Sequence, residues 1–457
     1  MGAPISRSMC CSIREKDGQY KGMSPDSPEF IQAEAEISLA DPRLIAFSPP
    51  WATGTRRLAL ASSHEVHVYG MLQGAAKSGA MMSAPPMVHE LTLDVQERNM
   101  ITAISFKDDT SPRWLVVAFG PADASIGRKH FIRVWCCEAD NRPDQSVPFA
   151  SALECPRTLK LEDSALSLDD HAAPVTYLET NSFYLASCDA GGECKVFQKN
   201  RSCMLKATAR LHKGPVSDFG LDKNFIYSLG EDLNIRIWNV SDLKQVAVIP
   251  AGRVQVSLLT GQEGQAIPVM LPAVQDTPRV GNIDKQDATC FQLSELTALK
   301  RPLSRWAGQQ ASARSSAQVL PRGALFVAGV LPRGQSAEVE QAGILMEWSL
   351  NPTPVCQSAI IAHDLPIVTM AYGPCDNGPL ITADMRGLCR IWDCTPKLWC
   401  SQQIEAANLG AGSLQLASRV RLALDPMNYA VFAVAGEKRL LVWQQRQTVG
   451  SGFRTDL

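Results

Sequence analysis

The feature that most constrains this chain is a unit of about thirty residues that recurs along it. Three segments, 171–197, 212–238 and 363–392, each open with a histidine, have a proline three residues later and close on an aromatic residue. Three short runs of β-forming residues, separated by turn residues, lie between these ends. A repeat of this size, with several strands in each copy, is typical of a β-propeller built from four-stranded blades.

Weaker copies of the unit extend the array at 44–71, 100–138, 315–350 and 418–445. The closing residues of two neighbouring units, Trp238 and Trp348, are 110 residues apart, about twice the usual spacing of the array. We interpret three apolar runs in this gap as strands of an eighth, degenerate blade; they are 254–260, 265–271 and 287–293. We therefore favour eight blades over seven, although seven is the commoner number for such folds.

On these segments the chain resembles the WD-repeat family of β-propellers, over roughly residues 34–447. Only the unit that closes at Trp238 matches the family pattern closely, with SLGEDLNIRIW at 228–238. The resemblance implies a buried hydrogen-bonded chain of His212, Ser228, Asp232 and Trp238. Such a chain is physically reasonable because a buried carboxylate needs donors, and the other three side chains supply them. We expect this network to be structural and not catalytic.

Two other units depart from that pattern. The units that close at Phe197 and Trp392 have no aspartate at the position of Asp232. In the second of these the nearest acid, Asp384, lies two residues earlier, and Asp189 stands at the same offset in the first. We expect a longer turn in both hairpins and a complete network in only one blade. It follows that loss of Asp232 should cost more stability than loss of Asp189, whose blade lacks the tryptophan.

Counting strands predicts how the ring closes. The chain ends soon after the third strand of its last unit, 439–445, and the segment 33–41 alternates as a single strand should. We expect this N-terminal strand to complete the last blade, because an unpaired sheet edge is an aggregation hazard. The predicted organisation is a flexible tail at 1–32, a propeller at 33–447 and a short tail at 448–457.

Composition and motifs exclude several function classes. The net charge of −2 provides no field that would recruit nucleic acid. No apolar run is long enough to span a bilayer, and the N-terminus lacks the apolar core of a secretory signal. We therefore expect a cytoplasmic protein with its 14 cysteines reduced and mostly buried as small hydrophobes. The chain has no zinc-type spacing and no catalytic motif, so we expect no metal, no cofactor and no enzyme activity.

The remaining expectation is a non-enzymatic scaffold that binds other proteins, because binding residues concentrate on loops held by rigid sheets. The alternative is a substrate-recruiting subunit of a ubiquitin ligase or a similar multisubunit complex. The W-D-x-R box that WD-repeat proteins use in that role is incomplete, since Trp392-Asp393 is followed by Cys394-Thr395. The basic F-R-R-G motif of phosphoinositide-binding propellers is absent.

The N-terminus suggests attachment to a cytosolic membrane face. Met1 and Gly2, with Ser6, fit the pattern for N-myristoylation at Gly2, and Cys10 and Cys11 offer nearby palmitoylation sites. One acyl chain binds membranes only marginally, whereas two hold a protein stably. We expect the polar segment that follows to act as a tether.

A block of positive charge is the last feature. Residues 296–337 contain no acid and six cations. Such a block could meet an acidic partner or an anionic membrane surface. Alternatively, the six cations point in different directions, since side chains alternate faces along strands. They are Lys300, Arg301, Arg305, Arg314, Arg322 and Arg333.

Overall fold

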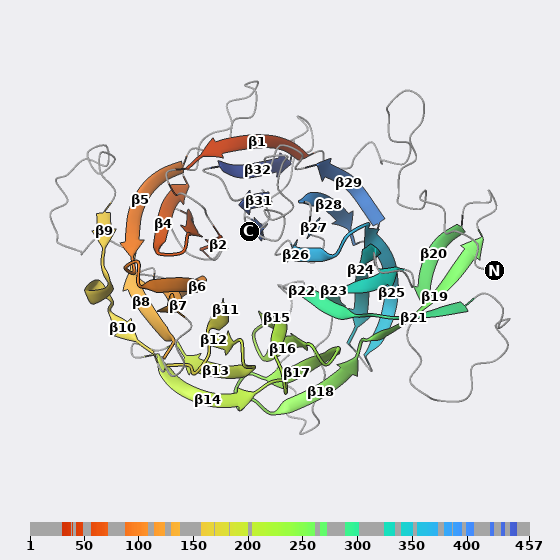
Figure 1. The fold of residues 1–457 in the computed structure, drawn as a ribbon, viewed down its shortest axis with the longest axis horizontal. Coiled ribbons are helices and arrows are strands. Elements are labelled where there is room, and N and C mark those ends of the chain that lie inside the picture. Colours follow the sequence, from red (N-terminus) through yellow and green to blue (C-terminus); the bar gives the residue numbers. More distant parts are fainter. Residues whose placement is uncertain are drawn as a thin grey trace, which may run out of the picture.

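The computed structural model is built almost wholly of β-strands (Figure 1). In the part of the chain that the structure describes, the only helix is one 3-10 turn, Leu161–Asp163. None of the described residues forms a helix long and apolar enough to cross a membrane. The described residues are 30–37, 39, 43–48, 56–71, 87–107, 114–123, 129–137, 157–168, 170–181, 183–199, 203–260, 266–271, 288–300, 324–333, 340–350, 354–372, 379–385, 387–394, 399–405, 421–424, 431–434 and 439–445.

Within the described part of the chain, seven sheets form the blades of a propeller, numbered here in chain order. Blade 1 contains β2 (Leu44–Phe47), β3 (Arg56–Ala61), β4 (Glu65–Met71), β5 (Met87–Asp94) and β9 (Arg157–Leu159). Blade 2 contains β6 (Asn99–Lys107), β7 (Trp114–Pro121), β8 (Phe131–Cys136) and β10 (Leu166–Ser167). Blade 3 contains β11 (Val175–Thr180), β12 (Tyr184–Asp189), β13 (Glu193–Gln198) and β14 (Met204–Arg210). Blade 4 contains β15 (Val216–Leu221), β16 (Phe225–Gly230), β17 (Asn234–Asn239) and β18 (Gln245–Pro250).

The remaining blades follow the same plan. Blade 5 contains β22 (Glu295–Lys300), β23 (Ala324–Arg333), β24 (Glu340–Ser349) and β25 (Val355–His363). Blade 6 contains β26 (Ile367–Tyr372), β27 (Leu380–Asp384), β28 (Leu388–Asp393) and β29 (Trp399–Glu405). Blade 7 contains β30 (Arg421–Leu424), β31 (Val431–Val434), β32 (Arg439–Gln445) and β1 (Phe30–Glu36).

The inner strands of these seven blades form a closed cycle. β2 lies against β6, β6 against β11, β11 against β15, β15 against β22, β22 against β26, β26 against β30, and β30 against β2. An eighth sheet contains β19 (Arg253–Thr260), β20 (Ala266–Leu271) and β21 (Ala288–Gln292), and β20 packs on β25 outside the ring. The preference for eight blades is therefore corrected. The three strands predicted in the long gap are present, but direct contact between β15 and β22 leaves them no place in the ring.

The N-terminal strand takes the place that strand counting predicts for it. β1 pairs antiparallel with β32, in a register that runs from Phe30 opposite Gln445 to Glu36 opposite Arg439. The strand begins at Phe30, a few residues before the predicted end of the tail. The two ends of the propeller are thus held together in one sheet.

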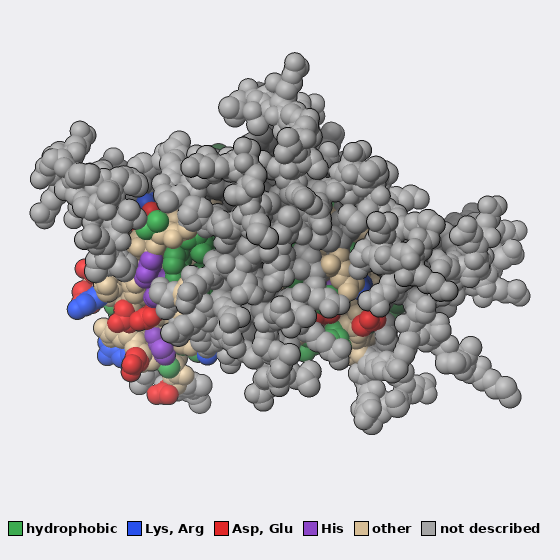
Figure 2. All heavy atoms as spheres, turned by 90° about the horizontal axis from the view of Figure 1, so that it is seen from above, with side chains coloured by type: hydrophobic (Ala, Val, Ile, Leu, Met, Phe, Trp, Pro, Cys, Tyr) green, Lys and Arg blue, Asp and Glu red, His purple; other side chains and the backbone are tan. Residues whose placement is uncertain are grey.

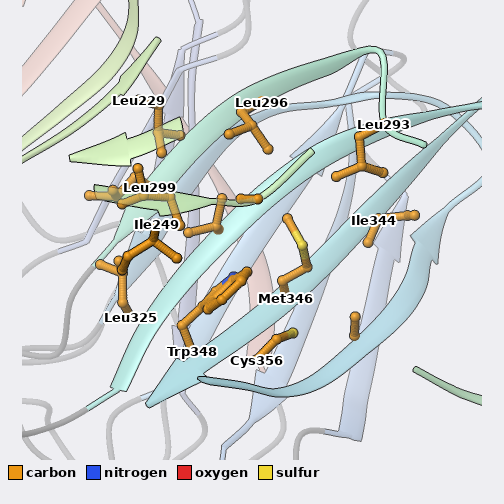
Figure 3. Packing of buried hydrophobic residues seen from close by; sticks show 14 of the residues in the cluster. Leu229, Ile249, Leu293, Leu296, Leu299, Leu325, Ile344, Met346, Trp348 and Cys356 are labelled. Carbon is orange, nitrogen blue, oxygen red and sulfur yellow. The ribbon is translucent and has the colours of Figure 1, made fainter. Parts of the chain in front are cut away.

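The middle strands are buried on both faces because each blade is packed between two others. β16 illustrates this, since Ile226, Tyr227, Ser228 and Leu229 are all buried. Among the described residues an apolar cluster joins blades 4 and 5, and it includes Leu229 and Ile249 of blade 4 with Met346 and Trp348 of blade 5 (Figure 3). Six of the described cysteines are buried, and none of the six forms a disulfide. Burial raises the pKa of Cys356 to about 12, so this thiol is protonated in the core.

One connection was not predicted from the sequence. After β8 the chain crosses back to blade 1, where β9 pairs parallel with the outer edge of β5, before β10 completes blade 2. Trp135 Nε1 donates a hydrogen bond of 3.0 Å to the Lys160 carbonyl, and Arg157 Nη2 donates one of 3.1 Å to the Cys136 carbonyl. This crossing segment therefore ties the first two blades to each other.

Candidate functional site

The structure brings together the four residues of the predicted network in blade 4. His212 lies just after β14, Ser228 is on β16, Asp232 is in the β16–β17 turn and Trp238 is on β17. His212 Nδ1 is 3.0 Å from Asp232 Oδ1, and its Nε2 is 2.8 Å from Ser228 Oγ. Trp238 Nε1 donates to the same Ser228 oxygen at 3.3 Å. The network joins the segment between two blades to the hairpin of the second.

Asp232 is the outer and partly solvated member of this network. Its side chain is 30% exposed, and Arg236 Nη2 lies 2.6 Å from its Oδ2. Burial alone would raise the pKa of Asp232, but hydrogen bonds from Arg236 and Asn234 and the charge of His212 lower it below the ordinary value. The carboxylate is thus ionised and shared between a histidine and an arginine.

Blade 3 contains a second network of the same kind. His171 Nδ1 lies 3.2 Å from Asp189 Oδ2, and His171 Nε2 lies 2.8 Å from Ser187 Oγ. Asp189 Oδ1 also accepts backbone hydrogen bonds from Gly191 at 3.0 Å and Glu193 at 2.9 Å. Unlike Asp232, Asp189 is almost fully buried, with 3% of its side chain exposed. Phe197 takes the place of the tryptophan, so this network has three members.

Blade 6 contains a third network. His363 Nε2 is 2.6 Å from Thr382 Oγ1, and Trp392 Nε1 donates to that oxygen at 2.9 Å. His363 Nδ1 faces Asp384 Oδ2 at 3.4 Å. Burial lowers the pKa of His363, although Asp384 opposes that shift. Blade 6 thus brings all four residue types together, but His363 Nδ1 has no hydrogen-bond partner, so among the described blades only blade 4 has the complete hydrogen-bonded chain that the sequence predicts.

The prediction of longer turns in blades 3 and 6 is wrong, because all three hairpins use the same turn. In each, the third residue after the strand end has a positive φ: 85° at Gly192, 56° at Leu233 and 78° at Gly387. The N–H of each of these residues bonds the carbonyl of the strand-end residue, at 2.9 to 3.0 Å. The two kinds of hairpin therefore differ in which turn position carries the carboxylate and not in length.

Two turn positions can deliver a carboxylate to the same place. Blade 4 has glycine at the strand end, and a Cβ on Gly230 would lie 2.2 Å from His212 Nδ1 and 2.8 Å from Asp232 Oδ1. In blade 3 the strand-end residue is Asp189, which itself reaches His171. Sequence comparison at a fixed offset from the aromatic residue misses this equivalence.

A second polar cluster lies between the inner strands of blades 3, 4 and 5. It contains Glu179 of β11, Asp218 of β15 and Lys300 of β22, all half-buried. Asp218 Oδ2 accepts the Leu299 N–H at 2.6 Å, which links blade 4 to blade 5. Burial raises the pKa of Glu179 to about 6, against the opposing charge of Lys300. Burial would lower the pKa of Lys300, but Asp218 and Glu179 raise it above its ordinary value.

This arrangement bears on the predicted basic block. Asp218 and Glu179, which raise the pKa of Lys300, offset part of the positive charge that this residue would bring to such a block. Arg333 ends β23, and nothing further is described of its side chain. The other four cations, and the proposed lipidation sites, lie outside the described residues; they are Arg301, Arg305, Arg314, Arg322, Gly2, Cys10 and Cys11.

Blade 1 carries the two histidines that flank Glu65. His64 Nδ1 is 2.6 Å from the Asn99 carbonyl, whereas the ring of His67 stacks on His89 with centroids 4.4 Å apart. His67 is buried, and burial together with the charge of His89 lowers its pKa to about 4. Figure 2, which looks at the edge of the disc, shows histidines among acidic and basic side chains at the end where Figure 1 draws β5, β8 and β9.

An exposed apolar patch lies at one end of blade 3, where β12, β13 and β14 meet. Phe183 is 52% exposed and precedes Tyr184, which pairs with Gln198. Met204, which pairs with Gln198 on its other side, is 61% exposed. Leu205, which follows Met204, is 41% exposed. Because Leu205 follows Met204 on the same strand, its side chain points to the other face. We call Phe183 and Met204 the blade 3 patch.

Two lysines border the blade 3 patch. Lys206 Nζ lies 4.9 Å from the centre of the Tyr184 ring and donates to its hydroxyl at 3.1 Å. Lys223 comes from the β15–β16 turn of blade 4, and its Nζ lies 6.0 Å from the centre of the Phe183 ring. The surface therefore spans two blades and combines exposed apolar side chains with positive charge.

Comparisons with known proteins agree with this architecture. No sequence-family model matches the chain, and no curated protein matches it. The fold is similar to that of a chain in the crystal structure of the mitotic checkpoint complex, with a TM-score of 0.51 and 13% identity over 97% of this chain and 95% of that one. It is also similar to the WD40 β-propeller domain of Doa1, with a TM-score of 0.51 and 12% identity over 92% of this chain and 98% of that one. The chain therefore has the WD40-type β-propeller fold that its sequence predicts.

Proposed function

We propose that this chain is a protein-interaction scaffold without catalytic activity of its own. The observation that carries the proposal is the blade 3 patch. Soluble proteins expose single large hydrophobic side chains often, but neighbouring exposed ones more often mark a binding surface. Here Phe183 and Met204, both more than half exposed, lie near the ends of β12 and β14, the two strands that pair with β13 on either side in a rigid blade. A partner that covers them gains apolar burial without having to order the loop that holds them.

The chemistry of the patch suggests the kind of partner. Lysine ammonium groups beside Phe183 and Tyr184 leave positive charge around an apolar centre. A complementary segment has an apolar anchor flanked by acidic residues, because opposite potentials across an interface steer and orient the encounter. The chain's small net charge of −2 makes such a local field matter more than any global one.

Burial argues against the one arrangement that could suggest catalysis. Histidine, aspartate and a hydroxyl residue occur together in three blades, in the combination of a hydrolytic triad. However, Ser187, Ser228 and Thr382 are fully buried in middle strands, so no substrate can reach their oxygens. A nucleophile needs an adjacent space for the reacting atom. These sets are therefore best explained as hydrogen-bond networks that fix the loops.

Affinity capture of the tagged full chain from cells, followed by mass spectrometry, tests the proposal. The test variant is Phe183→Glu with Met204→Glu, which puts two negative charges on the patch. The control is Val248→Glu, at a position on β18 that is 41% exposed. We expect partners that the wild type and the control retain to fall at least tenfold with the test variant.

The outcome that contradicts the proposal is equal recovery of every specific partner with all three proteins. Subunits of a ubiquitin ligase among the retained proteins would favour the alternative of a substrate-recruiting subunit. Circular dichroism and thermal unfolding of the purified variants show whether the charges have disturbed the fold.

A further inference from the structure

The network of blade 3 differs from the other two in having a second carboxylate. Glu193 Oε2 lies 3.6 Å from His171 Nδ1, and Asp189 Oδ2 lies 3.2 Å from the same nitrogen. The three ligand-type atoms all lie within 4.8 Å of one another. From this geometry we propose that His171, Asp189 and Glu193 form a binding site for a first-row divalent cation such as Zn²⁺.

The distances suit a tetrahedral ion. Zinc bonds nitrogen and carboxylate oxygen at about 2.0–2.2 Å, which places two ligand atoms of a tetrahedron about 3.4 Å apart. The two distances from His171 Nδ1, 3.2 and 3.6 Å, bracket that value. One imidazole and two carboxylates are ligands that zinc and manganese accept, and the fourth position takes water.

The atoms around these ligands already hold two of them in place. Asp189 uses Oδ1 to accept the N–H groups of Gly191 and Glu193, which leaves Oδ2 directed at His171. His171 Nε2 contacts Ser187 Oγ at 2.8 Å. Outer contacts of this kind orient the ligands of protein metal sites and fix the histidine tautomer.

Binding requires His171 to carry its proton on Nε2, so that Nδ1 has a free lone pair. Ser187 Oγ can accept a hydrogen bond from this Nε2–H, because its own hydroxyl can donate to the Lys195 carbonyl, 3.4 Å away. In blades 4 and 6 a tryptophan N–H already occupies the equivalent hydroxyl oxygen. Phe197 has no such N–H, so Ser187 Oγ keeps both of its lone pairs for other donors.

The equivalent positions in blades 4 and 6 lack the third ligand. Glu193 corresponds to Asn234 in blade 4 and to Leu388 in blade 6, and all three N–H groups bond the network's carboxylate. In blade 4, Arg236 also contacts Asp232 at 2.6 Å and supplies the positive charge that a metal would bring. At that position blade 3 has Lys195, whose Nζ bonds the Asp170 carbonyl at 2.5 Å and lies 3.9 Å from Glu193 Oε2.

A cation can reach the site from one side. The side chains of His171 and Asp189 are 0% and 3% exposed, whereas that of Glu193 is 41% exposed. Glu193 therefore closes the site from solvent, and a bound ion would fasten the β12–β13 hairpin to the segment that precedes β11. Because Glu193 is exposed, it can be changed without opening the core.

Zinc titration of the chelator-treated full chain, in competition with a chromogenic chelator, tests the proposal. The test variant is Glu193→Gln, which keeps the size of the side chain and removes its charge. The matched control is Glu231→Gln, which removes an exposed carboxylate from the equivalent hairpin of blade 4. We expect one equivalent of zinc to bind the wild type and the control, and that equivalent to bind at least tenfold more weakly to Glu193→Gln. Zinc should raise the unfolding temperature of the first two proteins more than that of the third.

Two results would overturn the site. One is a wild type that binds no zinc equivalent at micromolar concentration. The other is a Glu193→Gln chain whose affinity and stoichiometry equal those of the control, which would assign any bound zinc to cysteine or histidine elsewhere. The difference between the two variants isolates the blade 3 site from such binding, since both keep every cysteine and histidine.

Discussion

The aspartates of blades 3 and 4 should differ in their contribution to stability, in the order opposite to that expected from the sequence. In Asp189→Ala the buried His171 loses its carboxylate, and the N–H groups of Gly191 and Glu193 lose their acceptor. An unsatisfied buried polar group costs about 1–3 kcal/mol, and water can reach the two backbone groups in part. We expect a total loss of about 3 kcal/mol.

The same change at Asp232 should cost less. Its side chain is 30% exposed, so water can replace it beside His212, and Arg236 keeps its contact with Gln245. We expect a loss of about 1 kcal/mol, since solvent compensates most of a hydrogen bond at an exposed site. The ranking thus follows from burial, and the tryptophan of blade 4 does not reverse it.

Urea unfolding of the purified full-length variants measures the difference, with chelator present to exclude metal effects. Asp189→Asn is the matched control, because its amide oxygen can still accept the backbone N–H groups while the charge beside His171 is lost. It should lie between wild type and Asp189→Ala. Equal midpoints for Asp189→Ala and Asp232→Ala, or a lower midpoint for Asp232→Ala, would refute the reasoning from burial.

Three further predictions concern other parts of the chain. The pKa of His67 is lowered to about 4 in the folded protein, so its contribution to stability is complete above pH 6.5 and falls as the pH drops toward 4. His67→Gln should therefore flatten the dependence of unfolding free energy on pH in this range, and an unchanged slope would contradict the burial argument. Gly192→Ala should destabilise by about 2 kcal/mol, because φ at Gly192 is positive and the new Cβ would lie 2.7 Å from the Gly214 carbonyl oxygen. Gly191→Ala should cost less in the same urea unfolding assay, because its new Cβ would lie 3.3 Å from the nearest atom. If the N-terminus is acylated, membrane fractionation should show that Gly2→Ala, and Cys10→Ser combined with Cys11→Ser, both lose membrane association. A wild-type protein found wholly in the soluble fraction, with an unmodified N-terminus, would refute the lipid anchor.

The strands and their order could be predicted from the sequence because each depends on local pattern. Alternating residues and turn signals identify the repeat, and the fold they predict is confirmed. The position of β19–β21 could not be predicted in this way, because periodicity indicates that strands exist and not which neighbour they pack on. For the same reason β9, only three residues long, gives no local signal for its parallel pairing with β5.

Charges were harder to interpret than strands. Counting residues placed Lys300 in a basic block, but the fold puts it beside Glu179 and Asp218, which come from strands more than 80 residues earlier in the chain. The sequence identifies the carboxylates of blades 3 and 6, Asp189 and Asp384, but the prediction of longer turns around them is wrong for a related reason. A comparison at a fixed distance from the aromatic residue assumes that only one turn position can face the histidine, whereas the shared turn geometry allows two.

That equivalence makes a last prediction, in which the carboxylate of blade 3 is moved to the position it has in blade 4. Asp189 corresponds to Gly230, and Gly191 corresponds to Asp232, within turns of the same length. Asp189→Gly alone should destabilise as much as Asp189→Ala or more, because glycine also adds freedom to the unfolded chain. Adding Gly191→Asp should recover at least half of that loss. A Cβ at position 191 would lie 3.8 Å from Ala173 Cβ and 3.3 Å from Asp189 Oδ1, and the first change removes that oxygen. The double variant and each single variant can be compared by urea unfolding in chelator. If the double variant is no more stable than Asp189→Gly, a carboxylate in the turn cannot replace one at the strand end, and the three networks are not interchangeable.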